Sequence, residues 1–145
     1  MNKDRRFGLG HSIGAMATMK SASSHLGRQG EALAAAYLRN KGYRILEQNY
    51  RCQLGEIDII ALDRKTICFI EVKTRSTTYY DRPEVSVHKN KQQKLSRLAL
   101  WFLKKNQLHH ARARFDVVAI TRRGDLNEID HFVNAFDLAY PNKNM

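Results

Sequence analysis

The sequence predicts a single α/β domain, because segments with helical periodicity alternate with short apolar runs typical of strands. Two helix-patterned segments, residues 25–41 and 91–105, lie on either side of a pair of isoleucine-rich runs separated by a few polar residues. A further apolar run, residues 114–121, follows the second helical segment. With 145 residues, the chain is long enough to bury a core and has the usual length of one domain.

The amino-terminal residues 1–24 are expected to form a flexible extension, and residues 25–145 the domain. A basic start followed by an apolar stretch superficially resembles a signal peptide. His11, Ser12 and three glycines interrupt that stretch, so we expect no secretion. No run in the sequence approaches the roughly 18 continuous apolar residues of a membrane-spanning helix, and we therefore expect no membrane partner.

The first helix is predicted over residues 25–41, where leucines and a tyrosine recur at the spacing of one buried face and Gly42 marks the expected end. Several glycines and alanines in this segment would let the helix pack closely on a sheet. Glu31 lies off the buried face, two positions from Leu33, and would approach carboxylates on the strands. Alternatively, it is a first-turn carboxylate favoured by the helix dipole. Residues 43–50 then alternate as a strand at or near a sheet edge.

Two apolar runs, residues 56–62 and 67–72, predict a β-hairpin around a short polar turn. A turn centred midway between them places Asp58 opposite Glu71, and opposed side chains project on the same face roughly 5 Å apart. Lys73 shares the face of Glu71, because strand side chains alternate with period two. A two-residue or a four-residue loop with the same centre keeps this register. An odd-numbered loop or a bulge would break it.

The convergence of Asp58, Glu71 and Lys73 predicts a metal-dependent nuclease site. Mg²⁺ prefers carboxylate oxygens and takes one or two protein carboxylates together with waters and substrate phosphate. Such an ion lowers the pKa of a bound water and offsets charge on the phosphorus centre, and Lys73 would orient that water or contact the phosphate. The alternative is a cross-strand ion pair on a solvated sheet face. Two opposed carboxylates with one lysine leave a surplus negative charge, which favours a metal.

The polar segment of residues 74–90 follows the second hairpin strand directly, where loops often carry substrate contacts. A tyrosine of the pair Tyr79-Tyr80 would stack on an unpaired base, or both would pack back onto the domain. Basic residues of this segment are expected to contact phosphates; they are Arg75, Arg82 and Lys89.

The second helix, residues 91–105, has an apolar stripe on one face, and Trp101 would join that core or mark a dimer surface. Basic residues recur every third position along another strip of this helix; they are Lys91, Lys94 and Arg97. We expect this strip to follow a nucleic-acid backbone. A solvated helix face is the alternative for each of its members.

The last third of the chain contains the apolar strand of residues 114–121, and residues 126–140 are expected to add a strand and a closing helical turn. Asp116 would support a basic residue near the site or accept hydrogen bonds at the start of its strand, and is not predicted to be a ligand. His109 and His110 lack a matching cysteine or carboxylate spacing and are expected to be a solvated pair.

Charge and cysteine content narrow the choice of partner and compartment. The chain has 25 basic and 14 acidic residues, a net charge of +11. This balance favours a polyanionic partner, although ribosomal proteins and proteins of anionic membranes share it. Two cysteines do not make a disulfide framework, and without a CxxC pair we expect no zinc site. Cys68 is expected to be a buried thiol, and a reducing cytoplasm is the simplest location.

The hairpin segments GEIDIIA (55–61) and FIEVKTR (69–75) resemble the D…ExK signature of the restriction-endonuclease-like superfamily. With GRQGEA (27–32) and RFDVV (114–118) in the same order, the chain resembles the small YraN-type endonuclease-like proteins of bacteria, which are similar to archaeal Holliday-junction resolvases. The resemblance covers about residues 26–140. It implies a central mixed sheet flanked by helices, with Asp58 and Glu71 as metal ligands, Lys73 as the catalytic lysine and Glu31 as a further acidic group.

Two functions follow as expectations. The first is a Mg²⁺-dependent endonuclease, with Mn²⁺ as a substitute, that hydrolyses branched or otherwise structured DNA. RNA is the alternative substrate, and the resolvase resemblance is the one argument for a homodimer. The second is a nucleic-acid-binding protein that retains the nuclease fold and cleaves nothing. Opposed carboxylates favour the first, because without a metal they would repel phosphate.

Overall fold

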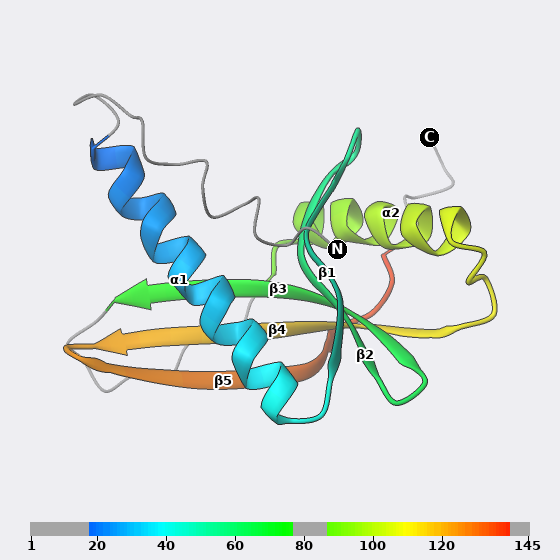
Figure 1. Cartoon of the computed structure of the whole chain (residues 1–145). Helices are drawn as coiled ribbons and strands as arrows, with labels where there is room; N and C mark the ends of the chain where they lie inside the picture. Colours follow the sequence, from blue (N-terminus) through cyan, green and yellow to red (C-terminus); the bar gives the residue numbers. More distant parts are fainter. Residues whose placement is uncertain (1–17, 77–86, 140–145) are drawn as a thin grey trace.

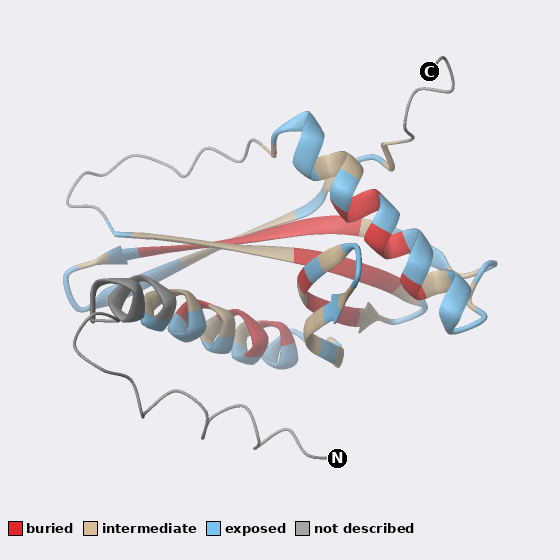
Figure 2. Cartoon of the chain, turned by 90° about the horizontal axis from the view of Figure 1, so that it is seen from above, coloured by how far each residue is buried: buried red, intermediate tan, exposed pale blue. Residues whose placement is uncertain are grey.

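A computed structural model of the chain describes residues 18–76 and 87–139, with the backbone alone described for residues 18–24. Five strands form one sheet in the order β1-β2-β3-β4-β5, and the two helices lie on opposite sides of it (Figures 1 and 2). The predicted fold class is confirmed: this is a single α/β domain with a mixed sheet flanked by helices, compatible with a restriction-endonuclease-like fold. The elements in chain order are α1 (Thr18–Asn40), β1 (Arg44–Cys52), β2 (Gly55–Asp63), β3 (Thr66–Ser76), α2 (Lys89–Lys105), β4 (Arg112–Arg123) and β5 (Leu126–Phe136).

The sheet is mixed because α2 provides one crossover. Parallel strands need a long connection, and β3 returns to pair with β4 in parallel after the segment that contains α2. The β1–β2, β2–β3 and β4–β5 pairs are joined by short turns and are antiparallel. The predicted edge position of the 43–50 strand is confirmed, since β1 lies at one end of the strand order.

Each face of the sheet has its own core (Figure 2). On one face, the small residues of α1 allow close packing, and Leu38 is fully buried against β2, β3 and β4. On the other face, the apolar stripe of α2 covers the opposite sides of the same strands. The buried residues of that stripe are Leu95, Leu98, Ala99 and Phe102.

Gly30 sets how closely α1 approaches β3. A β-carbon at this position would collide with the Thr74 side chain, and Gly30 itself is buried. The absence of a side chain here lets the middle of α1 lie directly on the carboxyl-terminal half of β3. This contact fixes the position of Glu31, the next residue of the helix.

The predicted register of the hairpin is confirmed. The turn consists of Arg64 and Lys65, and Asp63 pairs with Thr66. Arg64 adopts a positive φ of 56°, so a left-handed residue closes this turn without the glycine or asparagine that usually marks one. Regular pairing runs from the turn to Ile59 and Ile70. Asp58 and Glu71 are the next residues on β2 and β3, counted away from the turn.

The first helix starts earlier than predicted. Helix α1 begins at Thr18 and so reaches into the segment expected to be an extension, while residues 1–17 lie outside the described part of the chain. The serines of residues 21–24 are mediocre helix formers and do not signal this earlier start. None of the helices in the described part is long and apolar enough to cross a membrane.

The closing helical turn predicted after the last strand is wrong for residues 126–139. Residues 126–136 form β5 throughout, and residues 137–139 contain no helix. Phe136 stacks on Phe115 with ring centroids 4.6 Å apart, which keeps the end of β5 on the sheet. The Ala139 N–H donates a hydrogen bond of 2.9 Å to Ser96 Oγ of α2. In a helical turn, this N–H would instead donate to a nearby backbone carbonyl.

Candidate active site

Asp58 is fixed where β2 separates from β3. Its Oδ2 accepts a hydrogen bond of 2.8 Å from the Val72 N–H, one residue beyond Glu71. The Asp58 carboxylate thus accepts a hydrogen bond from the β3 backbone just beyond Ile59 and Ile70, the last regular pair between the two strands. The predicted neighbourhood of Asp58 and Glu71 is therefore present, although the contact runs through the β3 backbone rather than through ladder pairing.

The surroundings of Asp58 disfavour its charged form. Burial raises the pKa of Asp58 to about 6, and the Glu71 carboxylate acts in the same direction. The Val72 N–H and the Lys91 ammonium lower this pKa without cancelling the rise. Two carboxylates held together in this way repel each other, and a cation between them would relieve the repulsion.

Lys91 supplies part of the missing positive charge. Its Nζ lies 3.4 Å from Oε1 of Glu71, whose side chain is only 16% exposed. The prediction placed Lys91 on a strip that follows a nucleic-acid backbone. In the structure, the first turn of α2 directs this residue to the carboxylate pair, so Lys91 belongs with the site itself.

Glu31 reaches the same site from α1. Burial raises the pKa of Glu31, and the Asp58 carboxylate raises it further. A side-chain hydrogen bond from Asn49 partly offsets these effects. Two elements on opposite faces of the sheet therefore contribute to one site, because α1 brings Glu31 and α2 brings Lys91.

Asn49 is the site residue that sequence reasoning missed. Its neighbours Gln48 and Tyr50 pair with Ile59 and Ile57, which places Asn49 level with Asp58 on the adjacent strand. Asn49 has a φ of 52°, a left-handed conformation that asparagine tolerates better than most residues. The only sequence signal was an asparagine within an otherwise strand-like run.

The row of polar side chains on β3 continues beyond Glu71. Regular pairing with β4 extends to Ser76, so Lys73 and Arg75 project on the same face as Glu71. Both are partly buried, and Arg75 Nε donates to Thr121 Oγ1 at 3.4 Å. Arg75 was expected in a loop and instead lies near the end of the strand.

The remaining basic residues predicted to contact nucleic acid lie mainly on α2. Lys89, Lys94 and Arg97 are exposed. The Lys94 side chain lies against Gly55 at the tip of the β1–β2 hairpin, which stands out from the plane of the other strands in Figure 1. Arg82 lies outside the described residues.

The donor set fits a hard divalent cation that keeps much of its own water. Asp58 and Glu71 provide two carboxylates from adjacent strands, which is the number that Mg²⁺ commonly takes from a protein. Within residues 18–76 and 87–139, no group of three or more His, Cys, Asp or Glu side chains could hold a metal ion. Both cysteines are free thiols.

Other predictions concern residues away from this site. Asp116 was expected to support a basic residue near the site or to accept hydrogen bonds at the start of its strand. It is fully buried, pairs with Arg114 and accepts a hydrogen bond from the Asn134 N–H. Cys68 is fully buried, as expected. His109 and His110 are both exposed, and Trp101 is 45% exposed on α2.

The sequence matches one family of known proteins over most of the domain. A model of the Uncharacterised protein family UPF0102 matches residues 30–120. A UPF0102 protein of Geobacter metallireducens is 48% identical over 122 residues, covering 84% of this chain and 100% of that protein. A UPF0102 protein of Pelobacter propionicus is 42% identical over 139 residues, covering 94% of this chain and 99% of that protein.

The matched residues include both hairpin strands, α2 and most of the buried part of β4. They begin at Gly30 and thus include Glu31, Asp58, Glu71 and Lys73. These findings confirm the family expected from the D…ExK segments: the chain belongs to the Uncharacterised protein family UPF0102, the YraN family.

Proposed function

We propose that this protein is a Mg²⁺-dependent endonuclease that hydrolyses phosphodiester bonds in DNA. The observation that carries the proposal is the carboxylate pair of Asp58 and Glu71, which is held together although burial and mutual repulsion raise the pKa of Asp58 to about 6. Groups kept in such an unfavourable state within a polar site are typical of catalysis or ligand binding.

The residues of the site have distinct roles in this proposal. Asp58 and Glu71 would hold the ion, which when bound supplies an acidified water and positive charge next to the reacting phosphorus. Lys73 projects beside Glu71 as a compact charge that orients the attacking water or contacts the scissile phosphate. Glu31, whose raised pKa favours proton uptake, would exchange a proton with that water.

The basic residues around the site supply the binding surface. Arg75 extends the polar row of β3. Lys89, Lys94 and Arg97 are exposed on α2, the helix whose Lys91 contacts Glu71. Contacts of this kind bind phosphates without reading sequence, which suits a substrate recognised by its shape. A branched or otherwise structured DNA is the substrate class implied by the resemblance to resolvases.

The test is cleavage of labelled DNA in four forms: linear duplex, single strand, flap and four-way junction. Each is incubated with Mg²⁺, Mn²⁺ or EDTA. Cutting should require a divalent ion, and Asp58→Asn or Glu71→Gln should reduce it by about a hundredfold or more. Glu47→Gln, which alters an exposed carboxylate of the same sheet, is the matched control and should retain cleavage.

The same assay separates the enzyme from a binding protein with this fold. Salt-sensitive DNA binding without cutting in any metal would support the binding protein, in which the Lys91–Glu71 ion pair serves as a permanent substitute for a metal. Equal cleavage by the wild type and the Asp58→Asn, Glu71→Gln double variant would contradict the proposed site.

A further inference from the structure

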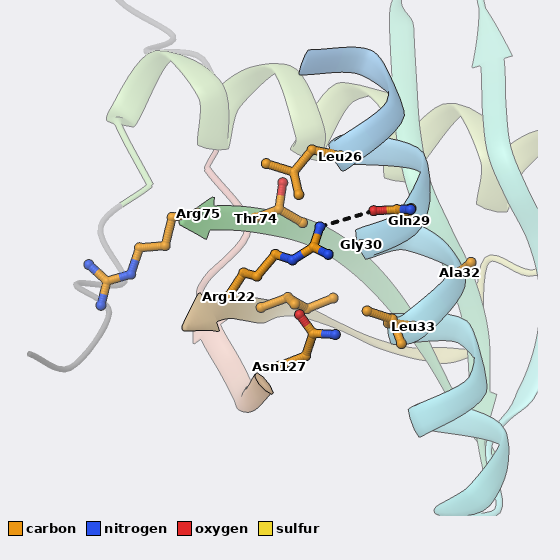
Figure 3. Close-up of a pocket in the computed structure, with 10 residues that line it drawn as sticks. Leu26, Gln29, Gly30, Ala32, Leu33, Thr74, Arg75, Arg122 and Asn127 are labelled. Carbon is orange, nitrogen blue, oxygen red and sulfur yellow. Dashed lines mark hydrogen bonds between the residues drawn. The ribbon is translucent and has the colours of Figure 1, made fainter. Parts of the chain in front are cut away.

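A pocket of about 400 Å³ lies between α1 and the sheet (Figure 3). It is at the carboxyl ends of the parallel strands β3 and β4, the edge at which open α/β sheets commonly bind ligands. Its volume is near the lower end of the range for small-molecule sites, about 300–1,000 Å³. The pocket is therefore large enough for a small ligand.

The walls of the pocket are apolar, whereas its rim is polar. Leu26 and Leu33 of α1 line the pocket together with Ile120 of β4. Gln29, Arg122 and Asn127 converge on the rim from α1, β4 and β5, as the close-up shows. No carboxylate is among the described residues that line this pocket.

The rim groups are available to bind a ligand. Arg122 Nη1 donates to Gln29 Oε1 at 3.4 Å, a long hydrogen bond between two exposed side chains. A ligand could replace this contact at little cost. Together, the guanidinium and two side-chain amides offer several donors and two acceptors above an apolar slot.

This combination matches the chemistry of a nucleotide. A nucleobase has flat apolar faces that fit between aliphatic side chains and polar edges that match amide groups, and its phosphate pairs with a guanidinium. A lipid tail would leave the amide and guanidinium groups without partners, and an inorganic anion would leave the apolar walls unused.

The pocket is also connected to the candidate active site through both of its walls. Gly30 lines the pocket and precedes Glu31, while Thr74 lines the pocket and follows Lys73. The close packing of Gly30 on Thr74 joins these two walls. A nucleotide in the pocket would thus touch the Gly30–Thr74 contact between α1 and β3, and this contact also positions Glu31 and Lys73.

We infer that this pocket binds a single nucleotide, its base between Leu33 and Ile120 and its phosphate at Arg122. The inference rests on the proposed function, because the nucleotide comes either from an unpaired position of the substrate strand or from the free mononucleotide pool. Both sources share the same base and phosphate chemistry.

The test uses the full chain with selectively labelled isoleucine and leucine methyl groups, titrated with each of the four deoxynucleoside 5′-monophosphates, the matching nucleosides and inorganic phosphate. At least one mononucleotide should shift the methyl resonances of Ile120 and Leu33, and inorganic phosphate should not. Arg122→Gln should weaken this binding about tenfold, the effect of losing one hydrogen bond to a charged group. Arg112→Gln removes an exposed arginine from the other end of β4 and should leave binding unchanged.

A short single strand with one abasic position separates the two sources. Stronger methyl shifts with the intact strand than with the abasic strand indicate a nucleotide of the substrate, whereas shifts with mononucleotides alone indicate the free pool. The inference is overturned if no nucleotide shifts these methyl groups, if phosphate shifts them equally, or if Arg122→Gln binds as tightly as the wild type. Loss of nucleotide binding with intact DNA cleavage would reject the pocket alone, and nucleotide binding without cleavage would reject the endonuclease.

Discussion

Asp58 and Asp116 are aspartates on strands of the same sheet, and both lie among apolar residues. Their surroundings have opposite effects. Burial would raise the pKa of Asp116, but hydrogen bonds from His131 and Arg114 outweigh it and hold this pKa below its ordinary value. The pKa of Asp58 is instead raised to about 6, because burial and the Glu71 carboxylate outweigh its single backbone donor.

The surroundings of Asp116 are those of a structural carboxylate. Arg114 Nε lies 3.0 Å from Oδ1, and His131 Nε2 lies 2.9 Å from Oδ2. The Asn134 N–H donates to Oδ1 at 2.9 Å. Arg114 continues this network to Asp63 of β2 and to the hydroxyl of Tyr43, the residue before β1.

The difference between Asp58 and Asp116 shows that the groups around a buried carboxylate distinguish a structural role from a ligand-binding one. Where donors surround the group, as at Asp116, its charge is compensated and its removal is damaging. Where a second carboxylate stands beside it, as at Asp58, the fold holds an unfavourable charge that a ligand would stabilise. Both aspartates lie within an apolar strand, and their neighbours determine whether the pKa is raised or lowered.

The largest effect is expected from removing the compensated charge. Asp116→Asn should lower the free energy of unfolding by about 3 kcal/mol, because Arg114 and His131 lose a buried anionic partner. Chemical denaturation at neutral pH measures this loss. Asp137→Asn, which alters an exposed carboxylate after β5, should change stability by less than about 0.5 kcal/mol. Equal stability of the two variants would show that the Asp116 network adds little.

A somewhat smaller effect is expected from adding metal. Mg²⁺ at about a hundred times its dissociation constant should stabilise the wild type by about 2.7 kcal/mol, because it binds the folded site only. Thermal unfolding with Mg²⁺ and with EDTA measures the gain. Glu71→Gln should lose this gain and Asp116→Asn should keep it. A gain that persists in Glu71→Gln would place the metal elsewhere.

The smallest effect is expected in the pH dependence of stability without metal. A raised native pKa means that the folded state binds the extra proton, so the stability that Asp58 contributes is present below about pH 4 and lost as the pH rises towards 6. Asp116 has a lowered pKa, and its contribution is lost only as the pH falls below about 4. Between these limits, the wild type should lose on the order of 1–2 kcal/mol relative to Asp58→Asn as the pH rises.

Denaturation curves of both proteins in EDTA at pH 4, 5 and 6 provide the comparison. Subtracting one variant from the other cancels the histidines, which titrate in both. A constant difference across this range would mean that Asp58 is not held at a raised pKa.

The strand and helix patterns predicted most of the fold because they depend on local side-chain periodicity. The β2–β3 register followed from the centre of one turn, and the structure has that register even though Arg64 carries no turn signal. The absence of a helical turn in residues 126–139 was not predictable, because their conformation depends on contacts with Phe115 and Ser96, which are distant in sequence. The early start of α1 was hidden by serines with weak helix preference.

The candidate site was predictable only where its residues share a hairpin. Asp58 and Glu71 could be brought together by counting along two adjacent strands. The pairing of Lys91 with Glu71 depends on how α2 crosses the sheet, and Asn49 depends on a left-handed residue within β1. No local pattern encodes either of these. The opposite roles of Asp58 and Asp116 likewise arise from neighbours that only the tertiary structure assembles.

The most direct test of this contrast is the free energy of unfolding of Asp58→Asn in EDTA at pH 7, measured beside Asp116→Asn and the wild type. Asparagine can still accept the Val72 hydrogen bond while removing the repulsion from Glu71, so Asp58→Asn should equal the wild type or exceed it by about 1 kcal/mol. Asp116→Asn should fall well below both. If Asp58→Asn is destabilised as strongly as Asp116→Asn, Asp58 is a structural carboxylate, and the account of a site held ready for a metal is wrong.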